Sequence, residues 1–133
     1  MLRYLLDTNV CIRVLRDRPP SMRERFNAHA SELCISTIVL TELLHGAAKS
    51  ARPTDNRQQV ENMAGRLEVL SYDEAAAAHA GEIRAELERK GLGIGTFDTL
   101  IAGHARSRGL AVVTGNLREF ERVPGLLCED WLN

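Results

Sequence analysis

Short apolar runs alternate along the chain with longer segments whose apolar positions recur at helical spacing. The first run, residues 4–6, is too short for a helix and is apolar on both faces, as a strand buried on both sides would be. A helix follows at once, because Val10 and Val14 recur at helical spacing. Thr8 or Asn9 can cap that helix. The chain therefore begins as strand, turn and helix, and we expect this strand to be central in its sheet.

The same alternation continues to the end of the chain. Further strands are predicted at 33–35, 67–70, 110–114 and 126–128. Helices are predicted at 21–29, 37–49, 54–64, 73–90, 97–108 and, as a short turn, 118–121, with Ser36 or Thr37 and Thr96 as caps. Strands that alternate with helices imply right-handed crossovers and a parallel sheet covered on both faces. The sequence thus predicts one domain over residues 1–133, a three-layer α/β/α sandwich with a central, mainly parallel sheet.

Composition narrows the class of protein. The formal net charge is -1, so bulk charge alone does not suggest a nucleic-acid binder. Among the 17 basic residues only Lys49 and Lys90 are lysines. Arginine favours phosphate contacts. Codon bias in a high-GC genome is nevertheless the better explanation for the excess of arginine over lysine. Cys11, Cys34 and Cys128 lack a metal-binding spacing and are interpreted as buried thiols. Without a signal peptide or a long apolar span, we expect a cytoplasmic protein that does not contact a membrane.

Four polar side chains are predicted to meet at one edge of the sheet. Asp7 and Asn116 follow strands, whereas Glu42 and Asp98 are placed in the first turns of helices that begin at the same edge. Asp98 shares a helix face with Ile101 and the alanines that follow it, so it is expected to point inward. Each acid alone has an ordinary explanation as a cap or turn residue. Glu42 on an apolar face is harder to explain in that way.

Three carboxylates that converge at a half-buried edge would raise each other's pKa unless a cation joined them. Mg²⁺, with Mn²⁺ as a substitute, is the cation expected, because it is held by one or two carboxylates and keeps waters for a phosphate ligand. The histidines share no metal-ligand spacing and are interpreted as surface or helix-face residues: His29, His45, His79 and His104.

With these residues in place, the chain resembles a known family. The segments that carry the resemblance are 5–9 (Leu-Leu-Asp-Thr-Asn), 35–43, 97–102 (Phe-Asp-Thr-Leu-Ile-Ala) and 112–116. They are similar to the PIN-domain ribonucleases, and the match spans nearly the whole chain. Segments 102–110 and 118–123 resemble the branch of VapC toxins, from bacterial type II toxin–antitoxin pairs, that cleaves initiator tRNA in its anticodon loop.

The resemblance implies roles for individual residues. Asp7 and Asp98 would be metal ligands and Glu42 the third acid. Many PIN domains have an acid where this chain has Asn116, so the fourth acidic role is either absent or moved to Glu119. Thr8, Ser36 and Thr114 would be polar neighbours of the acids. The family also implies a homodimer, a VapB-type antitoxin whose tail covers the active-site groove, a larger toxin–antitoxin complex, and operator DNA contacted only through the antitoxin.

A carboxylate-bound Mg²⁺ can polarise a scissile phosphate and orient an attacking water, so the expected activity is endoribonuclease cleavage without a need for the 2′-hydroxyl. Candidate phosphate contacts, each equally explained as a solvated helix face, are Arg13, Arg16, Arg106 and Arg118. Two alternatives stay open. One is a Mg²⁺-dependent phosphatase or phosphotransferase, although Asp7 lacks a second acid two residues on. The other is a non-catalytic partner-binding module.

Overall fold

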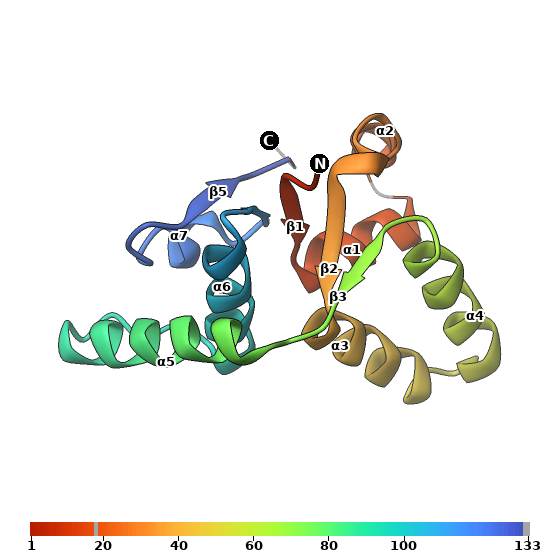
Figure 1. Ribbon diagram of the computed structural model, residues 1–133. Coiled ribbons are helices and arrows are strands. Elements are labelled where there is room, and N and C mark those ends of the chain that lie inside the picture. Colours follow the sequence, from red (N-terminus) through yellow and green to blue (C-terminus); the bar gives the residue numbers. More distant parts are fainter. Residues whose placement is uncertain (18, 132–133) are drawn as a thin grey trace.

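The computed structural model describes residues 1–17 and 19–131 (Figure 1). The strands are β1 (Tyr4–Leu6), β2 (Leu33–Ser36), β3 (Glu68–Leu70), β4 (Ala111–Val113) and β5 (Leu127–Glu129). The α-helices are α1 (Thr8–Arg16), α2 (Pro20–Ala28), α3 (Thr37–Ala48), α4 (Pro53–Ala64), α5 (Glu74–Arg89), α6 (Thr96–Arg108) and α7 (Leu117–Phe120). One 3₁₀ turn, Ala30–Glu32, precedes β2. All the elements predicted from the sequence are present, and their ends differ from the prediction by about one residue.

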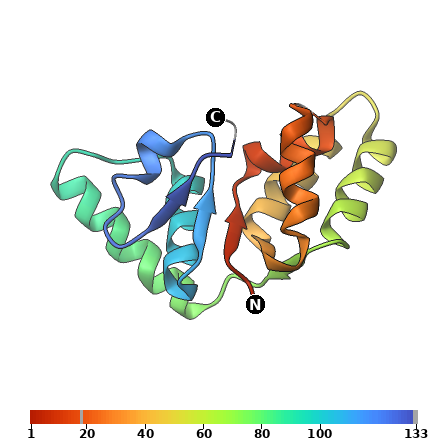
Figure 2. The ribbon, with the colours of Figure 1, turned by 90° about the horizontal axis from the view of Figure 1, so that it is seen from above.

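The strands in this part of the chain form one five-stranded sheet in the order β3-β2-β1-β4-β5. Every pairing is parallel, and β1 lies at the centre, as its two apolar faces predicted. Helices α1 to α4 lie on one side of the sheet and α5 to α7 on the other (Figure 2). The chain is thus a three-layer α/β/α sandwich, because each parallel crossover must carry a helix over a face of the sheet.

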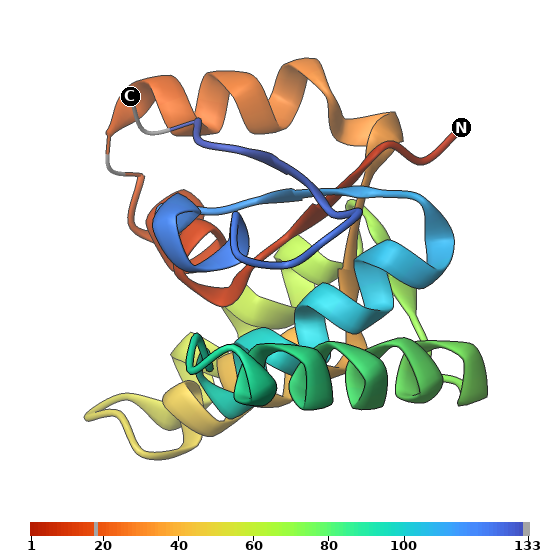
Figure 3. The same cartoon turned by 90° about the vertical axis from the view of Figure 1, so that its left-hand side faces the viewer.

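The core consists of strand side chains that are buried from both faces. Leu5, Leu6 and Val112 have no exposed surface. Burial on both faces explains why the sequences of these short strands are continuously apolar. Helices α5 and α6 lie side by side on one face (Figure 3). Their contact is close at Gly103, where a built Cβ would lie 2.6 Å from the backbone nitrogen of Ala80. A glycine is therefore needed at this point of the helix pair.

The direction of the crossovers changes between β1 and β4. After β1 the chain moves toward β2 and β3, and after β3 it crosses to β4 and β5 on the other side of β1. In open parallel sheets the crevice at such a switch point, outside the carboxyl ends of the strands, is where ligands bind. Residues that follow β1 and β4 are thus placed at the position where a ligand is expected.

Three local expectations are corrected by the structure. Asp7, not Thr8 or Asn9, caps α1, because its side chain accepts a hydrogen bond from the Val10 N–H. Gly95 precedes α6, and Thr96 is its first residue and not a side-chain cap. Glu42 is the sixth residue of α3 and so lies in its second turn rather than its first.

Of the four histidines interpreted as surface or helix-face residues, His104 lies on a buried face of α6. This side chain has no exposed surface, and neither ring nitrogen has a hydrogen-bond partner among the described residues. Its ring stands edge-on to that of Tyr72, with the centroids 5.1 Å apart. Burial lowers the pKa of His104, which keeps the imidazole neutral in this apolar site.

The thiols are buried to different degrees. Cys11 and Cys34 are buried as predicted, whereas Cys128 is only partly buried. None of the helices within residues 1–17 and 19–131 is long and apolar enough to cross a membrane.

Candidate active site at the carboxyl edge of the sheet

Asp7 occupies the centre of the candidate site and is 4% exposed. Its backbone N–H donates to the Val113 carbonyl at 3.0 Å, which extends the β1–β4 ladder to the residue itself. Its side chain accepts from the Val10 N–H at 2.9 Å and from the Thr114 hydroxyl at 2.5 Å. Burial raises the pKa of Asp7, while these two hydrogen bonds lower it. The carboxylate is thus buried but held by donors from both neighbouring elements.

Asn116 connects two further acids. Its side-chain amide donates to Glu119 Oε2 at 3.0 Å and lies 3.4 Å from Asp98 Oδ2. Its backbone N–H donates to the Thr114 hydroxyl at 2.8 Å. A continuous set of hydrogen bonds therefore joins Asp7, through Thr114 and Asn116, to Asp98 and Glu119. The prediction that Glu119 reaches the same edge as Asn116 agrees with this geometry.

Glu42 approaches the site from α3. It accepts a 2.5 Å hydrogen bond from the hydroxyl of Thr8, the first residue of α1. This partner explains how a glutamate is tolerated on a mostly apolar helix face. Glu42 is close enough to the other acids that its charge contributes to raising the pKa of both Asp7 and Asp98.

The effect of the acids on one another's pKa is clearest at Asp98. Its pKa is raised to about 6, first by burial and then by the charges of Asp7, Glu119 and Glu42, against the lowering effect of the Asn116 amide. Four carboxylates from four different segments are therefore electrostatically coupled at one edge of the sheet. Such crowding of like charges is typical of sites that hold a cation or perform acid–base chemistry.

An open hollow of about 420 Å³ lies in front of three of these acids, Asp7, Glu42 and Asp98. Its lining includes Asp7, Thr8, Glu42 and Asp98 together with Asn9, Ile12, Thr41, His45, Gly46, Lys49 and Phe97. A second hollow of about 390 Å³, between α1, α3 and α4, shares Ile12, Glu42, Gly46 and Lys49 with the first. The hollow at the acids therefore continues into a groove along α3.

Sequence reasoning did not single out Phe97, Lys49 or Gly46 as site residues. Phe97 is 48% exposed although it is a large apolar side chain. Its position directly before Asp98 was the only available signal. For Lys49, the signal was that it stands two helical turns after Glu42 on the same face.

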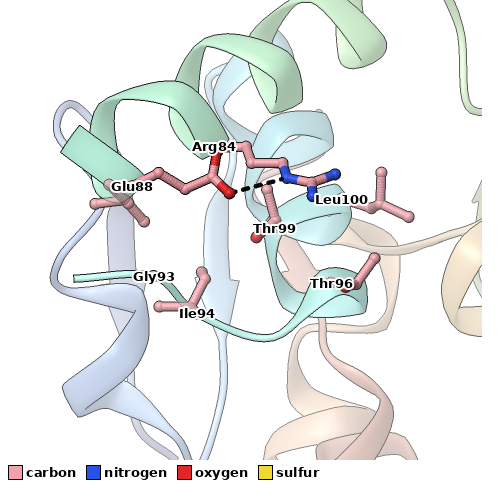
Figure 4. A pocket seen from close by; sticks show the side chains of 8 residues that line it. Arg84, Glu88, Gly93, Ile94, Thr96, Thr99 and Leu100 are labelled. Carbon is pink, nitrogen blue, oxygen red and sulfur yellow. Dashed lines mark ion pairs between the residues drawn. The ribbon is translucent and has the colours of Figure 1, made fainter. Parts of the chain in front are cut away.

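A third hollow, of about 180 Å³, lies on the other side of the first turn of α6 (Figure 4). Thr96, Thr99 and Leu100 line it, together with the 3.6 Å ion pair between Arg84 and Glu88. Phe97 and Asp98, on the opposite side of this turn, line the acidic hollow instead. The first turn of α6 therefore separates the two hollows, and the third contains none of the coupled acids.

The donor set fits a hard divalent cation in an open site. Within the described part of the chain, no group of three or more His, Cys, Asp or Glu side chains is arranged to hold a metal ion by itself. A closed, all-protein cage is thus not built here. Mg²⁺ does not need one, because it commonly uses one or two carboxylates and completes its shell with water and substrate phosphate. The carboxylate oxygens of Asp7, Glu42 and Asp98 suit a hard divalent cation better than zinc, which prefers nitrogen and sulfur ligands.

The remaining predicted residues differ in their surroundings. Ser36 is buried and caps α3 by accepting from the Ile38 N–H at 3.0 Å, so the structure gives it a local role. Arg13 and Arg118 are exposed, and the exposed Arg16 lines the groove along α3.

Arg106 is placed differently from the prediction. Its guanidinium donates to His79 Nδ1 at 2.9 Å and to the Pro124 carbonyl at 3.0 Å, and it pairs with Glu82 at 3.3 Å. Arg106 therefore ties α5 and the segment before β5 to the C-terminal end of α6, away from Asp98 in its first turn.

Comparison with known proteins agrees with this fold. Residues 4–126 match the PIN domain family. The chain is 57% identical to the tRNA(fMet)-specific endonuclease VapC of Salmonella typhimurium, over 98% of this chain and 99% of the relative. It is 55% identical, with the same coverage, to the tRNA(fMet)-specific endonuclease VapC of Shigella flexneri.

A solved structure described as DNA-bound VapBC from Salmonella typhimurium contains a chain that superposes with a TM-score of 0.95 at 57% identity, covering 98% of this chain and 99% of that one. The parallel sheet and the helices around it thus have their counterpart in that chain. Within the PIN-domain nucleases, this chain belongs to the VapC family.

Proposed function

We propose that this protein is a metal-dependent endoribonuclease that cuts initiator tRNA in its anticodon loop and so inhibits translation. The observation that carries the proposal is that Asp7, Glu42 and Asp98 line one open hollow, where the charges of Asp7, Glu119 and Glu42 raise the pKa of Asp98. The substrate is inferred from relatives at 55–57% identity that are named tRNA(fMet)-specific endonucleases. A loop suits an open hollow, because unpaired nucleotides can enter where a duplex cannot.

The cation proposed for the site is Mg²⁺, with Mn²⁺ as a substitute. Asp7 and Asp98 would hold it and Glu42 would be the third acid, because these carboxylates line one hollow. A bound Mg²⁺ supplies polarisation of the scissile phosphate and a lowered pKa for the attacking water.

The chain's own residues orient these ligands. Thr114 and the Val10 N–H fix both oxygens of Asp7. Asn116 holds Asp98 and Glu119 by its amide, so removing it would leave these carboxylates free to turn.

A VapB-type antitoxin is the proposed partner, and the complex would contain a homodimer of this chain. The support is that the chain resembles, at 57% identity, a chain in a structure described as DNA-bound VapBC. We expect the antitoxin to cover the acidic hollow and to be the component that contacts operator DNA. Expression of this chain alone should arrest growth, co-expression with its antitoxin should restore it, and Asp98→Asn expressed alone should be harmless. Unimpaired growth with soluble, wild-type chain alone would contradict the toxin role.

The direct test is to incubate the purified protein with total RNA in Mg²⁺ or in chelator and to map the new 5′ ends. We expect one dominant cut, in the anticodon loop of initiator tRNA, that disappears in chelator and in Asp98→Asn. A phosphatase would release inorganic phosphate without new ends, and a binding module would produce neither. No observation favours these alternatives, since Asn9 stands where an aspartyl phosphatase would need its second acid.

A further inference from the structure

The acidic hollow has a chemically mixed lining. Phe97, at the first turn of α6, exposes 48% of its surface beside Asp98. Lys49, at the C-cap of α3, lines both the acidic hollow and the adjoining groove. Three of the coupled acids, Asp7, Glu42 and Asp98, line the same hollow. A ligand that fills this hollow thus meets an aromatic face, a set of carboxylates and a cation.

These features match the parts of a single-stranded nucleic acid. Exposed aromatic rings bind unpaired bases by stacking, which is tolerant of sequence. A lysine beside the acids can contact a phosphate that flanks the one being cut. Lys49 forms no ion pair with any residue that the structure describes, so its ammonium group is available for such a contact.

Gly46 adds an independent observation. It lies inside α3, where a glycine is less favourable than alanine, and a built Cβ would meet no atom within 4 Å. The fold therefore does not require a glycine here, in contrast to Gly103. Gly46 lines both the acidic hollow and the groove, so the space that its missing side chain leaves lies where the two join.

On the basis of the proposed function, we infer that Phe97 stacks on a base of the bound RNA, that Lys49 contacts a flanking phosphate, and that Gly46 leaves room for the strand between them. The strand then crosses the acids in an extended form, with the scissile phosphate opposite Asp7 and Asp98. Phe97 and Lys49 are positioning residues in this scheme. Their loss weakens substrate binding and leaves the chemical step intact.

The test is steady-state cleavage of in vitro transcribed initiator tRNA by the wild type and the variants Phe97→Leu, Lys49→Gln and Gly46→Ala. Phe97→Leu keeps an apolar side chain without a stacking face, and we expect about a tenfold higher KM at nearly constant kcat. Lys49→Gln should also raise KM, and it should reduce the slope of log affinity against log salt by roughly 0.7, the value for one phosphate contact on a single strand. Phe97→Leu should leave that slope unchanged.

For Gly46, the inference predicts opposite effects of one substitution on stability and on RNA binding, which a purely structural role would not produce. Gly46→Ala should melt at a higher temperature than the wild type, because alanine favours the helix, and yet bind RNA more weakly. Gly46→Leu should raise KM further, since it fills more of the space. The matched controls lie outside the hollow: Gly81→Ala in α5, where a Cβ also meets no atom within 4 Å, and Lys90→Gln at the C-cap of α5. Both should keep the wild-type KM.

A second substrate series locates the stacked base. Removing single bases on either side of the cut should reveal one position where the loss weakens binding to the wild type about tenfold but has no further effect on Phe97→Leu. Wild-type KM values in Phe97→Leu, Lys49→Gln and both Gly46 variants, with the wild type cutting tRNA normally, would overturn this inference and leave the proposed function standing. A change in molar mass of Phe97→Leu would make Phe97 a subunit contact and would overturn its role. Absence of any cut by the wild type would instead refute the proposed function.

Discussion

The hydroxyl of Thr114 donates a 2.5 Å hydrogen bond to Oδ2 of Asp7, from the end of β4 to the end of β1. The same hydroxyl accepts from the Asn116 N–H, which directs its proton toward Asp7. The Val10 N–H binds the other carboxylate oxygen. Asp7 is thus oriented by the sheet and by its own helix, and this relationship leads to the first prediction.

Thr114→Val keeps the shape of the side chain and removes the hydroxyl. Because the Thr114 hydrogen bond lowers the pKa of Asp7, its loss should move the acid limb of the pH–rate profile to higher pH. It should also reduce stability by about 1–3 kcal/mol, since the Asn116 N–H and Asp7 lose a partner. Thr114→Ser, which retains the hydroxyl, is the control. Superimposable pH–rate profiles for the wild type and Thr114→Val would contradict this role.

The second prediction concerns stability against pH in chelator. The pKa of Asp98 is 3.8 in the reference state and about 6 in the folded protein. Between these values the folded state binds more protons than the unfolded state, so stability falls as pH rises from about 4 to about 6. Asp98 is partly exposed, so the loss should be about 1 kcal/mol, or roughly 3–5 °C in melting temperature.

Asp98→Asn has no proton to lose and should lack this part of the fall. Thermal melts of both proteins between pH 4 and 8 should therefore show the variant at or above the wild type near pH 7. Parallel curves for the wild type and Asp98→Asn would contradict the raised pKa.

The third prediction concerns Asn116, which stands where many PIN domains have an acid. Asn116 donates to both Asp98 and Glu119, so it acts on the carboxylates and not as a charge of its own. Glu119→Gln should raise the Mg²⁺ concentration required for half-maximal cleavage without abolishing activity, and Asn116→Ala should do so to a smaller extent. Cleavage measured against Mg²⁺ concentration tests both. Unchanged titrations would leave Asp7, Glu42 and Asp98 as the whole site.

The fourth prediction uses two helix glycines with opposite surroundings. Gly103→Ala would place a Cβ 2.6 Å from the Ala80 backbone and should destabilise the protein by roughly 1–3 kcal/mol or more. Gly81→Ala, on the exposed side of α5, should stabilise it by about 0.5–1 kcal/mol. Urea unfolding of the two variants measures the difference. Equal stabilities would mean that α5 and α6 can separate at little cost.

The fold could be predicted from the sequence because its strands are buried on both sides and its helices carry clear apolar spacing. The run at residues 4–6 sufficed to place β1 at the centre, and the alternation of elements sufficed for the parallel sheet. The convergence of Asp7, Asp98 and Asn116 followed from topology alone, because parallel strands end at one edge.

Other features depend on three-dimensional packing that spacing does not encode. His104 was interpreted as a surface or helix-face residue, and it is buried because its helix, α6, packs against both α5 and the sheet. Arg106 was expected at the substrate and instead binds His79 and Pro124, since residues distant in sequence meet it at the far end of α6. Phe97 and Lys49 could not be predicted as site residues, because they come from different segments that only the fold brings to the same hollow.

The most direct test of the central claim is cleavage of initiator tRNA by four matched proteins in Mg²⁺: the wild type, Asp7→Asn, Asp98→Asn and Asp73→Asn. Asp73 caps α5, and asparagine caps a helix equally well, so this control loses one carboxylate outside the site. We predict that the wild type and Asp73→Asn cut the anticodon loop at equal rates, and that Asp7→Asn and Asp98→Asn, folded by circular dichroism, lose at least a hundredfold in rate. Wild-type rates in either Asp7→Asn or Asp98→Asn would contradict a metal-dependent nuclease site at this edge of the sheet.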